Sequence, residues 1–152
     1  MFNFFPQSKK GALLMQLLVS IGIIVMLSLI SIPFIRQYQP KLILNGTAKE
    51  LISDLRYTQQ LTVSEQEVYY LEMDQINSRY AIYKQSDPAD PIKNVELDPT
   101  VSYQSITDLT DDKVIYNSFG AVSEAGQIVL INSNGQTAAI DVRPSGYIQW
   151  HQ

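Results

Sequence analysis

Residues 9–35 read KKGALLMQLLVSIGIIVMLSLISIPFI, and this stretch decides how the rest of the chain is interpreted. No charged residue occurs between Gly11 and Ile35. As an α-helix that rises about 1.5 Å per residue, residues 12–35 would extend roughly 36 Å. A hydrocarbon core is about 30 Å thick. The stretch therefore predicts a membrane-spanning helix.

A secretory signal peptide fits this stretch poorly. Such a signal has an apolar region of about 7–15 residues followed by a small-x-small cleavage site. Here the apolar run is longer and ends in Ile32-Pro33-Phe34-Ile35-Arg36, which contains no such site. Position 2 is Phe2, so the glycine needed for myristoylation is absent. An ordinary, uncleaved single-pass anchor remains an alternative at this point.

The remainder of the chain is acidic. Two of the 11 Lys and Arg residues precede Gly11 and all 15 Asp and Glu residues follow Ile35, so the chain from Arg36 onward has a net charge of −6 (9 − 15). This balance disfavours nucleic acid as a partner, because phosphates attract basic surfaces. The chain has no cysteine, which excludes disulfides, thiol catalysis and cysteine-based metal sites.

Residues 36–66 show a second helical pattern, this time with one apolar face. The apolar stripe consists of Leu44, Ala48, Leu51, Ile52, Leu55 and Thr62. We expect Lys49, Glu50, Asp54 and Gln59 on the opposite, solvent-exposed face. One helix from about Ala12 to Glu65 is predicted, bent at Pro33, Pro40 or Gly46 but not ended there. The stripe is too short to favour a coiled coil.

From residue 67 onward the apolar period becomes two, which is typical of β-strands. We expect strands at Val68–Met73, Arg79–Lys84, Val101–Ile106, Val114–Phe119, Gly126–Ile131, Thr137–Val142 and Tyr147–Trp150, with a polar loop between the second and third. Asn134-Gly135 predicts a tight hairpin turn in which both residues take positive φ angles. The head, residues 67–152, is therefore expected to be an antiparallel sheet.

The N-terminal end of the apolar run resembles the signal cut by prepilin peptidase. Lys9, Lys10 and Gly11 stand directly before the run, and the resemblance places the cut between Gly11 and Ala12, with N-methylation of Ala12. Residues 1–11 would then be a leader peptide. The two lysines would hold the leader at the cytoplasmic surface, and Gly11 would offer the protease an extended peptide. Pro33 matches the helix-bending proline that pilins often carry.

Two residues depart from the usual pilin pattern. Most pilins carry a glutamate five residues into the mature chain, where this sequence has Gln16, and a phenylalanine just after the cut, where it has Ala12. A glutamine accepts a hydrogen bond but does not neutralise the α-amine of a neighbouring subunit. Gln16 is either a neutral polar substitution or the mark of a special position, such as the filament tip.

The second half of the chain resembles the GspH/FimT family of minor pilins and pseudopilins. The matching positions are Phe119, Gly120, Gly126, Gly135, Ile140, Val142, Gly146 and Ile148, together with Leu55–Leu61 at the helix end. The resemblance implies a pilin-like α+β fold, with residues 12–35 in the membrane or filament core. It further implies a single-pass inner-membrane protein with an extracytoplasmic head, whose partners are sibling pilins, prepilin peptidase and an inner-membrane assembly platform.

Sites for other chemistry are not expected. The single histidine, His151, is next to last and is predicted to be frayed, so no catalytic residue, metal or cofactor is predicted. The stretch from Asp108 to Asp112 offers oxygen ligands for calcium, but it matches no EF-hand loop and is taken as a solvated turn. Tyr69, Tyr70, Tyr80 and Tyr83 lie on paired strands, where we expect aromatic cross-strand contacts that stabilise the sheet. The segment from Arg143 to Gln152 has one Arg and no Lys, too little charge for binding DNA.

Overall fold

The computed structural model describes residues 9–151, and side chains from Gly11 onward except at residues 31–34, 36 and 37. The chain divides into two compact units, Met1–Gln39 and Pro40–Gln152. A single helix, α1 (Lys9–Glu65), supplies the described part of the first unit and continues into the second. The helix continues through Pro33, Pro40 and Gly46, as expected from the sequence.

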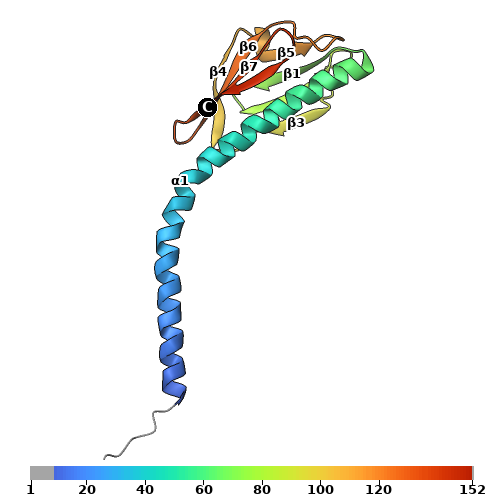
Figure 1. The fold of residues 1–152 in the computed structure, drawn as a ribbon. Helices are drawn as coiled ribbons and strands as arrows, with labels where there is room; N and C mark the ends of the chain where they lie inside the picture. Colours follow the sequence, from blue (N-terminus) through green and yellow to red (C-terminus); the bar gives the residue numbers. More distant parts are fainter. Residues whose placement is uncertain (1–8, 152) are drawn as a thin grey trace, which may run out of the picture. The chain divides into compact units, whose positions relative to one another are not determined.

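The second unit contains two four-stranded antiparallel sheets beside α1 (Figure 1). One sheet has the order β3-β2-β1-β5 and the other the order β4-β6-β7-β8. The strands are β1 (Tyr69–Asp74), β2 (Arg79–Lys84), β3 (Lys93–Glu96), β4 (Val101–Thr107), β5 (Lys113–Tyr116), β6 (Gly126–Asn132), β7 (Thr137–Val142) and β8 (Ile148–His151), with the short 3-10 helix η1 (Thr110–Asp112) before β5.

The predicted strands all exist, but one further strand and the division into two sheets were not predicted from the sequence. The missed strand is β3, which is short, is charged at both ends and lies in the proline-containing stretch taken as a loop. It forms because the edge of β2 is available, with Ile82 opposite Lys93 and Arg79 opposite Glu96. The predicted strand Val114–Phe119 is wrong beyond Tyr116, where the chain leaves the sheet.

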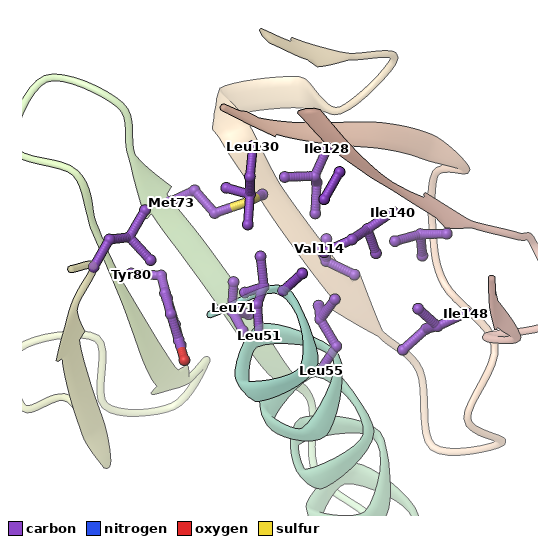
Figure 2. Close-up of a cluster of buried hydrophobic side chains, with 14 of the residues drawn as sticks. Leu51, Leu55, Leu71, Met73, Tyr80, Val114, Ile128, Leu130, Ile140 and Ile148 are labelled. Carbon is purple, nitrogen blue, oxygen red and sulfur yellow. The ribbon is translucent and has the colours of Figure 1, made fainter. Parts of the chain in front are cut away.

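The core of the head lies between the α1 stripe and both sheets. Leu51 and Leu55 of α1 face side chains from strands of both sheets (Figure 2). Leu44, Ala48, Leu51 and Leu55 are 0–2% exposed, as the 3.6-residue period predicts. Each fully buried leucine contributes about 1.5–3 kcal/mol. The stripe therefore fixes the helix to the sheets.

Two residues assigned to the solvent face of α1 contact the rest of the head instead. Asp54 is 5% exposed, and its carboxylate accepts a hydrogen bond of 2.6 Å from the Tyr80 hydroxyl. The Lys93 ammonium donates to both carboxylate oxygens at 2.6 and 2.7 Å. The Gln59 amide donates to the Gly120 carbonyl at 2.6 Å. Helical spacing alone misplaced both residues, because their partners are distant in sequence.

Two hairpins of the second sheet use the same turn. In the β6–β7 hairpin, the Gly135 N–H donates to the Asn132 carbonyl and the Asn132 N–H donates to the Gln136 carbonyl. The β7–β8 hairpin repeats this pattern from Arg143 to Tyr147, with Gly146 in the place of Gly135. Only the glycine of each turn has a positive φ, 76° and 77°. Each is a type I turn followed by a glycine bulge. The expected tight hairpin turn at Asn134-Gly135 therefore forms, although of these two residues only Gly135 has a positive φ.

Candidate membrane and assembly site

The N-terminal part of α1 presents a largely apolar surface. Gly11–Ile30 is long and apolar enough to cross a membrane, and none of its residues is buried within the structure. Its large apolar side chains are 51–73% exposed. The Ser20 and Ser28 hydroxyls donate to the Gln16 and Ile24 carbonyls at 2.9 and 2.8 Å. These internal hydrogen bonds satisfy polar groups that would find no water in lipid.

The residues of the expected cleavage site lie in the first turns of α1. The helix begins at Lys9, so the backbone of Gly11 and Ala12 is helical and not extended. Both residues are exposed, and a Cβ at Gly11 would meet no atom within 4 Å. The first turn of a helix has unsatisfied N–H groups and glycine favours unwinding, so opening this turn costs little. The side chains of Lys9 and Lys10 lie outside the described residues.

The structure brings only some of the predicted site residues together. Ala12 and Gln16 are four residues apart and lie on one face of α1. Gln16 is exposed, as is the rest of this face. Pro33 lies roughly 26 Å further along the helix, at about 1.5 Å per residue, and so belongs to a different part of it. Its side chain is outside the described residues.

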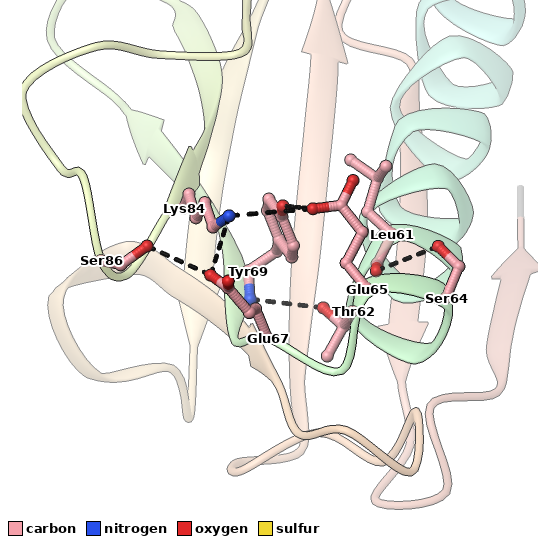
Figure 3. Close-up of polar contacts among 8 residues, drawn as sticks. All are labelled: Leu61, Thr62, Ser64, Glu65, Glu67, Tyr69, Lys84 and Ser86. Atoms are coloured by element: carbon pink, nitrogen blue, oxygen red, sulfur yellow. Dashed lines mark hydrogen bonds and ion pairs between the residues drawn. The ribbon is translucent and has the colours of Figure 1, made fainter.

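A polar cluster that the sequence did not indicate holds the C-terminal end of α1 (Figure 3). The Tyr69 hydroxyl donates to Glu65, and the Tyr69 N–H donates to the Thr62 hydroxyl at 3.3 Å. Lys84 forms an ion pair of 2.8 Å with Glu67. The bond to Glu65 raises the pKa of Tyr69, while the contact with Lys84 lowers the pKa of Glu67. These contacts join the helix end to β1 and β2.

The other residues considered for catalysis, metal binding or ligand stacking make ordinary structural contacts. The prediction that His151 is frayed is wrong: it ends β8, and its Nε2 lies 3.2 Å from a carboxylate oxygen of Asp141. Among the described residues, no group of three or more His, Cys, Asp or Glu could hold a metal ion. The Tyr70 and Tyr83 rings stack with centroids 5.4 Å apart, which confirms the expected cross-strand contact.

The fold is that of solved pilin subunits. No protein-family model and no curated protein matches the chain. The minor pseudopilin EpsH from the type 2 secretion system of Vibrio cholerae superimposes with a TM-score of 0.59 at 8% identity, covering 71% of this chain and 95% of that one. The type IV minor pilin FimU of Pseudomonas aeruginosa gives 0.59 at 16% identity, covering 79% and 93%. The chain therefore has a pilin-like α+β fold.

Proposed function

We propose that this chain is a minor pilin or pseudopilin, a structural and non-catalytic subunit of a type IV pilus, a type II secretion pseudopilus or a competence filament. The observation that carries the proposal is an entirely exposed apolar segment, Gly11–Ile30, on the helix that also forms part of the core of a pilin-like head. Such a surface needs a partner outside the chain. Lipid supplies that partner before assembly, and sibling helices supply it in the filament.

The N-terminal residues take the following roles in this proposal. Lys9 and Lys10 keep the leader, residues 1–11, at the cytoplasmic surface, and prepilin peptidase cuts between Gly11 and Ala12. Ala12 becomes the methylated N-terminus. Residues 12–35 form the membrane and then the filament-core helix, residues 36–66 its amphipathic continuation, and residues 67–152 the extracytoplasmic head. An inner-membrane platform extracts the processed subunit into the filament.

Processing is tested by the N-terminal residue of the mature protein. Co-expression with a prepilin peptidase should yield a chain that begins at Ala12, as read by mass spectrometry. Gly11→Val should abolish the cut, because a branched side chain hinders the protease at this peptide bond. Gly22→Val is the matched control, since a Cβ at either glycine meets no atom within 4 Å. An intact Met1 in the unmodified chain would overturn the proposal and favour a membrane-tethered binding module with an uncleaved anchor.

Position in the filament is tested at Gln16. We propose that Gln16 marks a subunit of the filament tip or of assembly initiation, where neutralisation of a neighbouring α-amine is not needed. Gln16→Glu should then move the subunit from the tip toward the shaft, as seen by immunogold labelling. An unchanged distribution would show that the glutamine is a neutral substitution. Membership of the GspH/FimT family, suggested by the glycine pattern of the head, is part of the same proposal.

A further inference from the structure

The loop after β5 displays an almost fully exposed aromatic side chain. Phe119 is 91% exposed, although the loop that carries it, residues 117–121, is firmly held. The Asn117 side-chain oxygen accepts from the Phe119 and Ala121 N–H groups at 3.0 and 3.1 Å. The Gln59 amide holds the Gly120 carbonyl from α1 at 2.6 Å. An aromatic residue on a pre-ordered loop loses little entropy on binding, which is typical of an interface anchor.

The neighbouring turn extends this feature into a basic, aromatic knob, which we define as Phe119, Arg143 and Tyr147. A Cβ at Gly146 would lie 2.1 Å from the Gly120 carbonyl oxygen, so the β7–β8 turn packs directly on the Phe119 loop. Tyr147 is 58% exposed, and the Arg143 guanidinium lies 5.8 Å from its ring centroid. Tyrosine, phenylalanine and arginine are the residue types enriched at protein interfaces.

The outer face of the first sheet contains a hollow of opposite charge. Ala81 is at its floor, with Glu72 beside it on β1 and Asn94 on β3. The hollow has a volume of about 830 Å³, and its lining includes Asp74, Asp111 and Asp112. Arg79 pairs with Asp74 at 3.0 Å, and Lys113 lies 3.8 Å from Glu72. Among the described side chains, no Lys or Arg forms an ion pair with Asp111 or Asp112, so the hollow is acidic.

The knob and the hollow lie at opposite ends of β5. Lys113, at the start of the strand, lines the hollow, whereas Tyr116, at its end, leads into the Phe119 loop. Four strand residues separate the ends by about 10 Å, at roughly 3.3 Å per residue. One molecule is therefore unable to place its own knob in its own hollow. A second molecule, displaced along β5, presents the complementary surface.

We infer that the knob of one head docks into the acidic hollow of a second copy of this chain. Phe119 enters the hollow above Ala81, and Arg143 lies against the carboxylates of Asp111 and Asp112. The contact uses different surfaces on the two copies, so it is head-to-tail. It goes beyond the proposed function, because both surfaces lie in the head and neither depends on cleavage at Gly11.

Disulfide trapping tests this contact, since the chain has no native cysteine. Full-length chains in detergent carry either Ser118→Cys beside the knob or Asn94→Cys at the hollow, and are mixed with copper phenanthroline as the oxidant. A disulfide requires Cα atoms within about 7 Å, so linkage reports close approach. We expect a linked heterodimer from this mixture. Asn134→Cys, at an exposed hairpin tip, replaces Ser118→Cys in the control mixture.

The anchor is tested by adding Phe119→Ala to the Ser118→Cys chain. Loss of an interface anchor should lower the yield of disulfide-linked heterodimer roughly tenfold or more. Ile92→Ala, which removes a 47% exposed side chain outside both surfaces, should leave linkage unchanged. Phe119 is outside the core, so the variant should unfold at the same temperature as its parent, which circular dichroism would verify. Linkage no higher than in the Asn134→Cys mixture, or equal linkage with and without Phe119, would overturn the inference.

Discussion

Residues 13–30 and residues 44–55 of α1 are both rich in leucine and isoleucine, yet they are buried to opposite extents. In the first segment every large apolar side chain is at least 51% exposed. In the second segment Leu44, Leu51 and Leu55 are at most 2% exposed. The difference arises because apolar residues surround the first segment of the helix, whereas they follow a single stripe in the second. A stripe can be covered by two sheets of the same chain, while an all-round apolar surface needs lipid or other helices.

The largest expected effect on stability comes from truncating a leucine of the buried stripe. Leu51→Ala should lower the free energy of unfolding by about 2–5 kcal/mol, because it removes apolar contacts and leaves a cavity between α1 and the sheets. Urea unfolding followed by circular dichroism measures the change. Leu42→Ala, on the same helix but 68% exposed, is the matched control and should change stability by less than about 0.5 kcal/mol. Equal effects would contradict the assignment of the core.

A charge in the exposed segment should act on membrane insertion alone. Ile21 lies near the middle of Gly11–Ile30, where an arginine costs about 2.5–3.5 kcal/mol on insertion. Ile21→Arg should therefore shift the protein out of the carbonate-resistant membrane fraction, and Ile21→Leu should not. Unfolding of the head should be unchanged in both variants. Full retention of the arginine variant in the membrane would contradict a spanning role for this segment.

Two glycines of the head, Gly135 and Gly146, share a backbone conformation but differ in what surrounds them. Gly135 and Gly146 have φ values of 76° and 77°, so alanine at either should cost about 1–2 kcal/mol in left-handed strain. At Gly146 the new Cβ would also meet the Gly120 carbonyl oxygen, whereas at Gly135 it would meet nothing within 4 Å. Gly146→Ala should therefore destabilise the head more than Gly135→Ala, measured by thermal unfolding. Equal losses would show that the two turns do not differ in packing.

The smallest effect is expected from alkaline pH. Burial raises the pKa of Tyr80, Tyr103 and Tyr116 above the ordinary value of 10.0, and the hydrogen bond to Asp54 adds to the effect at Tyr80. Below about pH 10 these phenols are protonated in both the folded and the unfolded chain, so ionisation does not reduce the free energy of unfolding. Above about pH 10 they ionise first in the unfolded chain, so the free energy of unfolding falls as pH rises. Urea unfolding at increasing pH should show this decline.

Tyr116→Phe isolates the contribution of one tyrosine to this pH dependence of stability. Its hydroxyl is buried without a hydrogen-bond partner among the described groups, so its removal should be neutral or slightly stabilising near neutral pH. Because the variant has one fewer buried phenol to ionise, its stability should decline less steeply above about pH 10 than that of the parent. An identical decline in both proteins would show that Tyr116 is not protected from ionisation in the folded head.

The periodic features of this fold could be predicted from the sequence, and the non-local ones could not. The buried stripe from Leu44 to Leu55 and the strands Arg79–Lys84 and Thr137–Val142 follow from local spacing. Asp54 was misplaced because Tyr80 and Lys93, which stabilise it, are 26 and 39 residues away. The division into two sheets likewise depends on pairings such as Tyr69 with Tyr116.

The N-terminal site was inferred from the sequence on a different basis. The roles of Gly11, Ala12 and Gln16 follow from local sequence order, without any tertiary contact, and they stay predictions. The knob and the hollow could not be found in the sequence in this way. Phe119 was assigned to a strand, and its exposure depends on where β5 ends and on the hydrogen bonds that Asn117 and Gln59 make to its loop.

The buried Asp54 and the half-buried Gln59 also give α1 a mechanical property. A force that pulls on the helix along its axis would load the ion pair with Lys93, the hydrogen bond to Gly120 and the leucine contacts in parallel. Parallel contacts loaded in shear must break together, unlike a strand peeled from a sheet edge one bond at a time. Because the pull is shared in this way, we expect the head to resist separation from its own helix, as the proposed extraction of the subunit from the membrane would require.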